Sequence, residues 1–392
     1  MEGRHGEEVA ALAAELVRIP SPNPPGEERA VAERLEAYLR WSGLEVERDQ
    51  VAEGRENLLV ELAGPRPGRT LSIVNHMDTV PPGEGWTREP FGGELEGGRL
   101  WGRGACDMKG GLAAALVAFR ALKERADRGL SLRHRVRLCL VVDEEGPFMR
   151  GAASLVERGR VGREDAVLSC EPTSLQLVVA QKGTLWFELL VRGRSAHAAA
   201  PQEGADAIHA MALALCGLKE RAAGLPHSHP RLGVTTVTVG RVEGGLKTNV
   251  VPDRCRAEVD ARFPPPLDSA GVQQMVEEAL AAGCARVSGT RGEVRPISVE
   301  RPPILAEEDA PAVAIFRRAH REVMGSELAL VGVPYYTDAG LIAARTGSRN
   351  CFLFGPGSIA QAHAPDEWVA LDELRMAARV LFRLLELWAV ED

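Results

Sequence analysis

Imidazole and carboxylate side chains follow several short apolar segments of this sequence. Residues 70–75, 138–142 and 166–170 are typical of buried strands, and each is followed at once by histidine or acidic residues. In open parallel sheets, ligands bind in the crevice outside the carboxyl ends of the strands. We therefore expect the side chains at these ends to meet in one site. They are His76, Asp78, Glu144, Glu145, Glu171 and, after a further strand near residue 352, His363.

Several carboxylates gathered in one site require cations. Buried acids raise one another's proton affinity unless positive charge neutralises them, and two divalent metal ions would do so. The mixture of imidazole and carboxylate, without a nearby cysteine pair, favours Zn²⁺, with Co²⁺ or Mn²⁺ as alternatives. Residues two apart in a strand share a face, so Asp78 is expected to orient the second ring nitrogen of His76 before it binds metal.

A bridging ligand is predicted at Asp107, in the glycine-rich segment GRGACDMKGG that leads into a helical pattern. One carboxylate can bridge two ions roughly 3.5 to 4 Å apart. The adjacent Glu144 and Glu145 cannot point the same way on an extended segment. One of the two can therefore bind metal while the other acts as a general base towards water.

The same glycine-rich segment has two other interpretations. A dinucleotide- or phosphate-binding loop is disfavoured because the segment lacks the G-x-G-x-x-G spacing and a K-[ST] ending. Cys106 could be read as a nucleophile, but no Cys–His signature accompanies it, so a packing role is favoured.

Composition limits the classes of partner. The net charge of −8 is spread along 392 residues without a cluster of Lys and Arg, which argues against nucleic-acid binding. The seven cysteines are isolated from one another, as in proteins of reducing compartments. No apolar stretch is long enough to span a bilayer. We therefore expect a cytoplasmic protein that acts on small molecules and binds neither nucleic acid nor membrane.

The chain is long enough for two domains. Strand-like segments alternate with helical patterns in residues 1–180 and again in 301–392, which predicts an α/β catalytic domain built on a mostly parallel sheet. Residues 181–300 instead read strand, helix, strand, strand, helix, strand. That order predicts an inserted ferredoxin-like α+β domain.

Five ordered motifs resemble the M20 metallopeptidase family: HMDTVPPG, GRGACDMKGG, DEEG, EPTS and GPGSIAQAHAPDE. The resemblance covers nearly the whole chain and implies a zinc-peptidase-like catalytic domain with two metal ions. It places His76 and Glu171 on the outer sides of the ions, Asp107 between them, and Glu145 and His363 at the opposite ends. It makes Glu144 the base that activates water and later protonates the leaving amine. It also implies a cis peptide bond after Asp107.

The inserted domain resembles the lid and dimerisation domain of the same family. The segment RGRSAHAAAPQEGADAI implies that His197 reaches the active site of a partner subunit and stabilises an oxyanion there. Asn249 and Arg262 match positions that bind the α-carboxylate of the substrate, a task for which an Arg fork is suited. The resemblance thus implies a homodimer formed through residues 181–300.

The resemblance leaves several substrates open. HMDTVPPG and DEEGPFMRG are similar to desuccinylases of succinyl-diaminopimelate, whereas EPTSLQLVVAQKG and PYYTDAGL are similar to acetylornithine deacetylases. Gln181 and Lys182 stand where desuccinylases carry paired Arg, so we favour an N-acetylornithine-type deacetylase. A dipeptidase or carboxypeptidase with the same metals is a further alternative. A metal-dependent binding protein without turnover would have no use for Glu144.

Overall fold

The computed structural model describes residues 4–391, which fall into two compact units. The first comprises the chain up to 179, 305–331 and the chain from 337 onward, and the second comprises 180–304 and 332–336. The sequence prediction had assigned 332–336 to the catalytic domain. In the structure this segment joins the second unit, where the N–H of Lys182 donates to the carbonyl of Val333 at 3.1 Å.

The first unit is built on a mixed sheet whose centre is parallel. Its strand order is β1-β2-β6-β3-β7-β15-β8-β13, and β14 also pairs with β8. The central strands β6, β3, β7 and β15 run parallel, whereas β1, β2 and β8 join antiparallel neighbours. The strands are β1 (Glu47–Ala52), β2 (Arg55–Leu62), β3 (Thr70–His76), β6 (Arg135–Val141), β7 (Ala166–Ser169), β8 (Leu177–Gln181), β13 (Ile304–Leu305), β14 (Leu330–Val333) and β15 (Cys351–Leu353).

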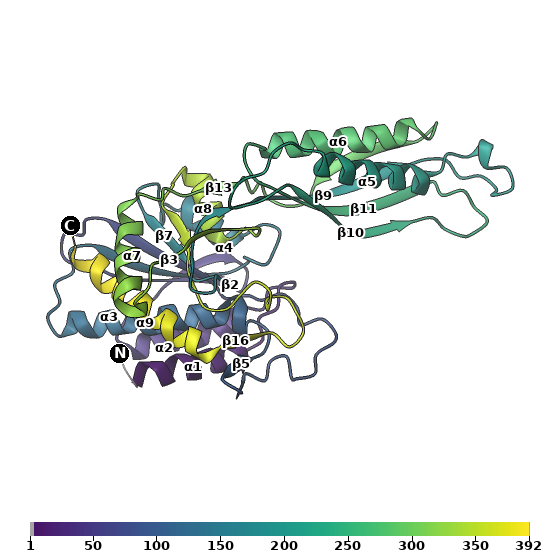
Figure 1. The fold of residues 1–392 in the computed structure, drawn as a ribbon. Helices are drawn as coiled ribbons and strands as arrows, with labels where there is room; N and C mark the ends of the chain where they lie inside the picture. Colours follow the sequence, from purple (N-terminus) through teal and green to yellow (C-terminus); the bar gives the residue numbers. More distant parts are fainter. Residues whose placement is uncertain (1–3, 392) are drawn as a thin grey trace. The chain divides into compact units, whose positions relative to one another are not determined.

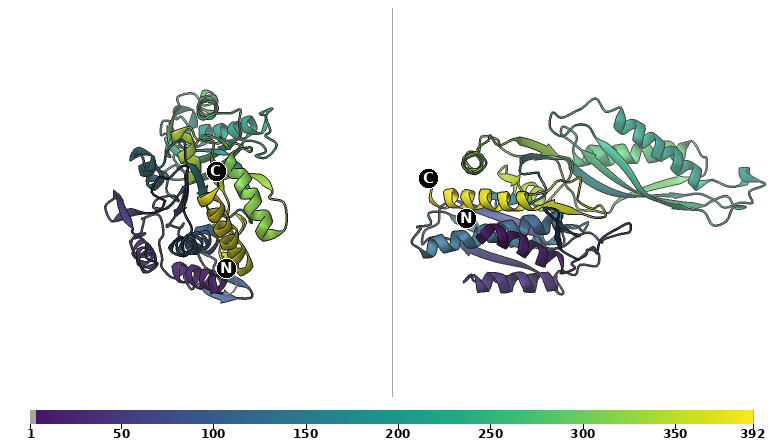
Figure 2. Two further views of the ribbon diagram at one scale, coloured as in Figure 1. Left: turned by 90° about the vertical axis from the view of Figure 1, so that its left-hand side faces the viewer. Right: turned by 60° about the horizontal axis from the view of Figure 1, so that its bottom comes forward.

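Helices cover both faces of this sheet, which explains why its central strands are apolar throughout (Figure 1). On one face α3 packs against α1 and α9, and α7 packs on α9; on the other, α4 packs against α8. Figure 2 shows the yellow α9 beside the purple α1. The helices are α1 (Arg4–Val17), α2 (Arg29–Trp41), α3 (Gly110–Asp127), α4 (Arg150–Glu157), α7 (Pro311–Met324), α8 (Asp338–Thr346) and α9 (Leu371–Val390). This arrangement confirms the predicted α/β class.

Helix α3 is the centre of the helical layer. Every residue from 110 to 122 is buried, because the helix is apolar around most of its circumference and lies between the sheet, α1 and α9. Its N-terminus therefore has a fixed position. The segment just before it contains Asp107, so the buried helix fixes one end of the candidate bridging segment.

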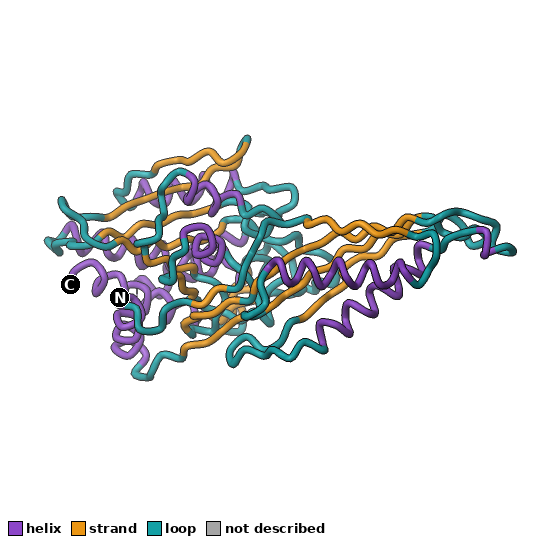
Figure 3. The backbone as a smooth tube through the Cα atoms, turned by 90° about the horizontal axis from the view of Figure 1, so that it is seen from above, coloured by secondary structure: helices purple, strands orange, loops and turns teal. Residues whose placement is uncertain are grey.

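The second unit has the predicted ferredoxin-like order. Its antiparallel sheet runs β10-β11-β9-β12, and α5 and α6 pack against each other and against the sheet. Strand β11 alternates strictly between buried and partly exposed residues, as expected for a sheet covered on one face. Figure 3 shows its long orange strands with purple helices beside them. The elements are β9 (Gly183–Arg192), α5 (Ala207–Ala223), β10 (Thr236–Gly244), β11 (Arg254–Phe263), α6 (Ser269–Ala285) and β12 (Arg291–Pro296).

A small antiparallel sheet, order β16-β5-β4, completes the first unit. Strand β16 (Trp368–Ala370) pairs with β5 (Arg99–Trp101), which pairs with β4 (Glu94–Glu96). The sequence analysis did not anticipate this sheet, because three-residue strands leave no periodic pattern. It joins the segment that follows His363 to the segment that precedes Asp107.

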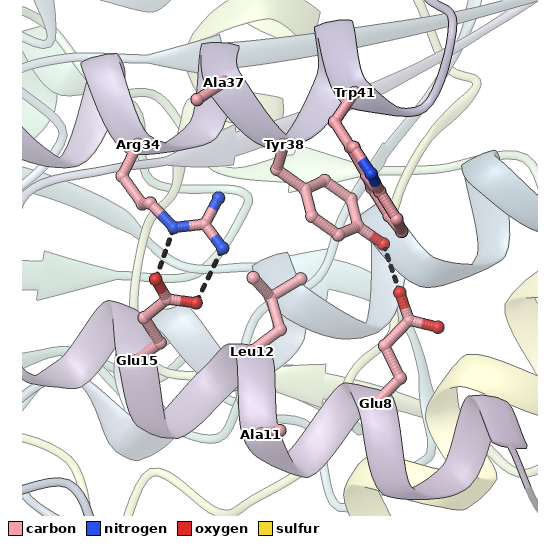
Figure 4. Close-up of a pocket in the computed structure, with 8 residues that line it drawn as sticks. All are labelled: Glu8, Ala11, Leu12, Glu15, Arg34, Ala37, Tyr38 and Trp41. Atoms are coloured by element: carbon pink, nitrogen blue, oxygen red, sulfur yellow. Dashed lines mark hydrogen bonds and ion pairs between the residues drawn. The ribbon is translucent and has the colours of Figure 1, made fainter.

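A surface hollow of about 340 Å³ lies between α1 and α2 (Figure 4). Arg34 and Glu15 form an ion pair across it, and the hydroxyl of Tyr38 donates to Glu8 at 2.9 Å. None of the candidate metal ligands lines this hollow. Within the described chain, every helix is too short or too polar to cross a bilayer.

Candidate metal centre

The carboxyl ends of the parallel strands bring the candidate ligands together. In the parallel pairing of β3 and β6, His76 stands opposite Val141, so the residues after both strands emerge at one edge of the sheet. Strand β7, which pairs with β3 on its other side, leads directly to Glu171. This register explains how side chains almost a hundred residues apart meet.

His76 presents one ring nitrogen to the centre. Its Nδ1 lies 2.9 Å from the backbone carbonyl of Asp78, and since a carbonyl can only accept, Nδ1 carries the proton. Its Nε2 is then left facing Asp107 Oδ1 at 3.2 Å. A carbonyl that fixes the ring in this way is the usual partner of a metal-binding histidine.

The two oxygens of Asp107 face different imidazoles. Oδ1 faces His76, and Oδ2 lies 3.3 Å from Nε2 of His363. Asp107 lies in the irregular segment Ala105–Lys109, with φ −121° and ψ 97°, and its peptide bond to Met108 is cis, as expected. One carboxylate is thus shared between two groups of donors.

The donors form two triads that share this carboxylate. The ligand atoms of each triad lie within 4.8 Å of one another, and His363 Nε2 lies 3.2 Å from Glu145 Oε1. Two ligands on one tetrahedral zinc, at bond lengths of about 2.0–2.1 Å, are roughly 3.3 Å apart, so the observed distances fit shared cations. The triads are His76, Asp107 and Glu171, and Asp107, Glu145 and His363.

The side chain of Glu144 belongs to neither Asp107 triad. Its carboxylate lies within 4.8 Å of ligand atoms of His76 and Glu145, in a third group that overlaps the other two. Burial raises its pKa well above the usual range, and Glu145 and Glu171 add to that effect against the opposing charge of His76. A carboxylate that lies beside both triads without belonging to either is placed to exchange a proton with a nearby water.

Burial and neighbouring charges shift the pKa values of the clustered side chains. Burial raises the pKa of Glu171 to about 8, with His76 opposing and Asp107 adding to the rise. Although burial works against it, hydrogen bonds to Asp107 and Glu145 raise the pKa of His363 to about 11. So many ionisable groups in one buried cluster favour a site that binds divalent cations.

Asp78 acts differently from the sequence expectation. Its carboxylate was expected to orient the ring of His76, but Oδ1 lies 3.7 Å from Nδ1, farther than the backbone carbonyl. The carboxylate instead accepts the backbone N–H groups of Glu144, at 3.2 Å, and Glu145, at 3.1 Å. Asp78 therefore orients the imidazole of His76 through its main chain. Through its side chain it orients the acidic loop, which carries Glu144 and Glu145.

Sequence reasoning missed two residues that hold the site. Asn23 donates to Asp78 Oδ2 at 2.8 Å, and Glu367 accepts the N–H of Asp107 at 3.0 Å. Asn23 lies in the segment IPSPNPPGE, whose Pro content indicates only a break between helices. Glu367 follows His363 by four residues, and this proximity was the only signal in the sequence.

The remaining predicted site residues lie in the second unit. His197 pairs with Val250, and the N–H of Ala198 donates to the carbonyl of Asn249 at 3.1 Å, so the segments of His197 and Asn249 are adjacent. Arg262, in β11, forms an ion pair with Asp260 at 3.0 Å. His197 and Asn249 are exposed, and Arg262 is half-buried.

Residues 73–387 match the family described as peptidase family M20/M25/M40. The chain is 31% identical to a succinyl-diaminopimelate desuccinylase of Methylobacterium sp. (strain 4-46), over 96% of this chain and 95% of that protein. It is 32% identical to an acetylornithine deacetylase of Myxococcus xanthus, over 96% of each.

Solved structures of the same family share the fold. An M20 family metallo-carboxypeptidase from Sulfolobus solfataricus matches with a TM-score of 0.80 at 21% identity, over 98% of this chain and 100% of that one. A dinuclear metal-binding M20 peptidase from Bacillus subtilis matches with a TM-score of 0.73 at 17% identity, over 98% of both. At these identities the likeness concerns the fold.

Proposed function

Because this chain belongs to peptidase family M20/M25/M40, and is thus a hydrolase of amide bonds, we propose that it removes the acyl group of a small N-acyl amino acid, with N-acetylornithine as the leading candidate substrate. The observation that carries the proposal is the division of the Asp107 carboxylate between two donor triads. Such a division is what a two-metal hydrolase needs.

We assign the two triads to two divalent cations, Zn²⁺ first and Co²⁺ or Mn²⁺ as alternatives. The donor set supports this choice because it combines imidazole with carboxylate and includes no thiolate. His76 and Glu171 would hold one ion, Glu145 and His363 the other, and Asp107 both. Bound divalent ions supply Lewis acidity, which lowers the pKa of water and polarises a carbonyl.

Glu144 is the proposed general base. Its carboxylate takes a proton from the attacking water and later delivers it to the departing nitrogen, so no covalent acyl-enzyme is needed. The hydrogen bond from its N–H to Asp78 supports this role, because it fixes the main chain beside the ligands.

The second unit is the proposed lid and dimer interface. We assign to His197 the stabilisation of the oxyanion in a partner subunit, and to Asn249 and Arg262 the binding of the substrate's α-carboxylate. Strand β10 supports an interface because it lies at a sheet edge, and Leu246, just beyond it, is 89% exposed. Arg262 must share its guanidinium between Asp260 and the substrate.

The cytoplasm is the proposed location. All seven cysteines are free, although six of them are buried, which fits a reducing compartment. Succinyl-diaminopimelate is the second candidate substrate, since the desuccinylase relative is as similar as the deacetylase. Gln181 and Lys182 stand where desuccinylases carry paired Arg, which weakens the case for a substrate with a second acyl carboxylate.

The test is a substrate panel with the full-length protein. Amine release is measured from N-acetylornithine, N-succinyl-diaminopimelate and simple dipeptides, with added Zn²⁺ or Co²⁺ and with a chelator. We expect N-acetylornithine to be turned over fastest and the chelator to abolish release. Preference for the succinyl substrate or for dipeptides would reassign the substrate class, and binding without any release would overturn the hydrolase.

A further inference from the structure

We infer that Glu367, supported by Arg103, is a positioning residue that sets the bridging carboxylate of Asp107. The inference rests on the proposed metal centre and concerns residues outside its ligand set. Glu367 and Arg103 are buried almost completely, at 1% and 2% exposure. Two opposite charges placed so deep require a specific arrangement of partners.

The carboxylate of Glu367 binds the main chain at the bridging residue. Its Oε1 accepts the N–H of Cys106 at 2.8 Å and the N–H of Asp107 at 3.0 Å. Its Oε2 accepts from Nη1 of Arg103 at 2.5 Å. Each oxygen therefore has its own donors, and the side chain has one stable orientation.

Arg103 is in turn held from a second direction. Its Nη2 donates to the carbonyl of Pro82 at 3.1 Å, and its guanidinium lies 5.2 Å from the ring of Trp86. The cation cannot move towards Asp107 without losing both contacts. It therefore keeps Glu367 aimed at the two N–H groups.

The position of the Asp107 main chain determines where its carboxylate lies, because only two side-chain torsions separate them. The φ and ψ of Asp107 are not helical, so its N–H needs a partner outside a helical ladder, and Glu367 supplies it. A carboxylate shared between two ions tolerates errors of only about 0.5 Å. The hydrogen bonds from Cys106 and Asp107 thus act on the most demanding ligand of the site.

Glu367 also links Asp107 to His363. Glu367 and His363 belong to one short segment. The backbone carbonyl of Glu367 accepts the N–H of Gly102, which lies in the segment before Asp107, at 2.8 Å. Three hydrogen bonds therefore join the segment of His363 to the segment of Asp107 through a single residue. We expect the ion held by Asp107, Glu145 and His363 to depend most on Glu367.

The experiment is a calorimetric titration of metal-free, full-length protein with Zn²⁺ alone, for wild type and Glu367→Gln. In the variant, the amide oxygen of Gln faces the cation of Arg103, so the NH₂ group faces the N–H groups of Cys106 and Asp107. Because donors then face donors, these hydrogen bonds are lost and Asp107 is displaced. We expect wild type to bind two ions and the variant to lose about 10- to 100-fold in affinity at one of them, the range found for partners of metal ligands.

Thr87→Val is the matched control. The hydroxyl of Thr87 donates to Asp366 Oδ2 at 2.7 Å, so this variant removes a hydrogen bond from the residue next to Glu367 and leaves the N–H of Asp107 bonded. We expect Thr87→Val to bind two ions within about twofold of wild type. An equal loss in both variants would overturn the inference, since any change in that turn would then suffice.

A double variant, Arg103→Met with Glu367→Gln, guards against misfolding. It removes both buried charges, and the freed amide oxygen can turn to the N–H groups of Cys106 and Asp107. We expect it to recover most of the affinity lost in Glu367→Gln. The inference is overturned, and the metal centre is not, if the folded double variant does not recover Zn²⁺ affinity or if Glu367→Gln binds Zn²⁺ as wild type does. Wild type that binds no Zn²⁺ overturns the metal centre itself.

Discussion

The side-chain amide of Asn23 donates a hydrogen bond of 2.8 Å to Asp78, which is fully buried. The same amide lies 3.1 Å from Asp143 Oδ1. Asp78 in turn accepts the N–H groups of Glu144 and Glu145. A residue of the N-terminal segment thus holds, through one carboxylate, the loop that carries the proposed base and a proposed ligand.

Replacing Asn23 with Ala should weaken the acidic loop. The carboxylates of Asp78 and Asp143 would lose a shared donor, which costs about 1–3 kcal/mol of unfolding free energy for a buried pair. We expect lower stability in urea and a fall in kcat. Asn23→Asp should be worse, because it adds a third acid between the other two. Unchanged kcat and stability in Asn23→Ala would disprove the link.

Glu144→Gln and Glu145→Gln should separate catalysis from metal binding, although the residues are adjacent. The first variant should bind two ions and lose about 10²- to 10⁴-fold in kcat, the usual contribution of a general base. The second should lose affinity for one ion. Metal content and turnover are measured on the same preparations. Near-normal turnover in Glu144→Gln would reassign the base.

Stability of the metal-free protein should fall as pH rises from about 4.5 to 8. The pKa of Glu171 is raised by burial to about 8, so the folded chain keeps a proton that the unfolded chain has released. Its stabilising contribution is complete below the unfolded pKa and is lost as pH rises through the folded one. Thermal unfolding with a chelator, from pH 5 to 8.5, measures it.

Glu171→Gln is the comparison for this pH dependence. The variant has no carboxyl group to titrate, so its metal-free form should show a flatter profile than wild type. Adding Zn²⁺ should stabilise wild type most at high pH, because a metal ion replaces the protons of its ligands. If the stability of the metal-free wild type and of the variant changes with pH in the same way, Glu171 is not the source of the pH dependence.

Mixing two inactive variants should restore activity if His197 acts across a dimer. A subunit with Glu144→Gln can supply His197 to a His197→Ala partner, whose base is intact. Random reassociation of equal amounts gives half hybrid dimers with one working site each, or about a quarter of wild-type activity. No recovery, with hybrid dimers verified by size and mass, would place His197 in its own subunit's site or outside catalysis.

Leu246→Glu should shift the protein towards monomers. The side chain is 89% exposed beyond the edge strand β10, and a charge there would oppose burial against a second copy. Light scattering after gel filtration measures the mass. Leu95→Glu, a change at another exposed apolar residue of the first unit, is the control and should keep the wild-type mass.

Sequence reasoning succeeded where strand ends determine position. His76, Glu145 and Glu171 follow parallel strands, so one rule about sheet edges was enough to expect their convergence. Sequence reasoning failed where a hydrogen bond joins two distant segments whose residue spacing gives no sign that they meet. The hydrogen bonds of Asn23 and Glu367 to the site span 55 and 260 residues, and local spacing carries no trace of them.

The edges of the fold were also beyond the sequence. Strands β1, β2 and β8 pair antiparallel around a parallel centre. The direction of such a strand depends on how it is connected to its neighbours, because its apolar residues alone do not indicate parallel or antiparallel pairing. The side chain of Asp78 was expected on the ring of His76 because period two places both on one face. The chain leaves the strand at His76, so that rule no longer holds at Asp78.

The interruption of the first unit by the second has a consequence for biosynthesis. A nascent chain that has emerged as far as residue 179 already carries His76, Asp107, Glu145 and Glu171, yet it lacks strand β15 and the segment of His363. The ribosome must finish the whole insertion and the segment up to residue 363 before the last of these candidate ligands appears. A chain that stops before residue 363 lacks a donor of one triad, so such truncated products should bind divalent cations more weakly than the full chain.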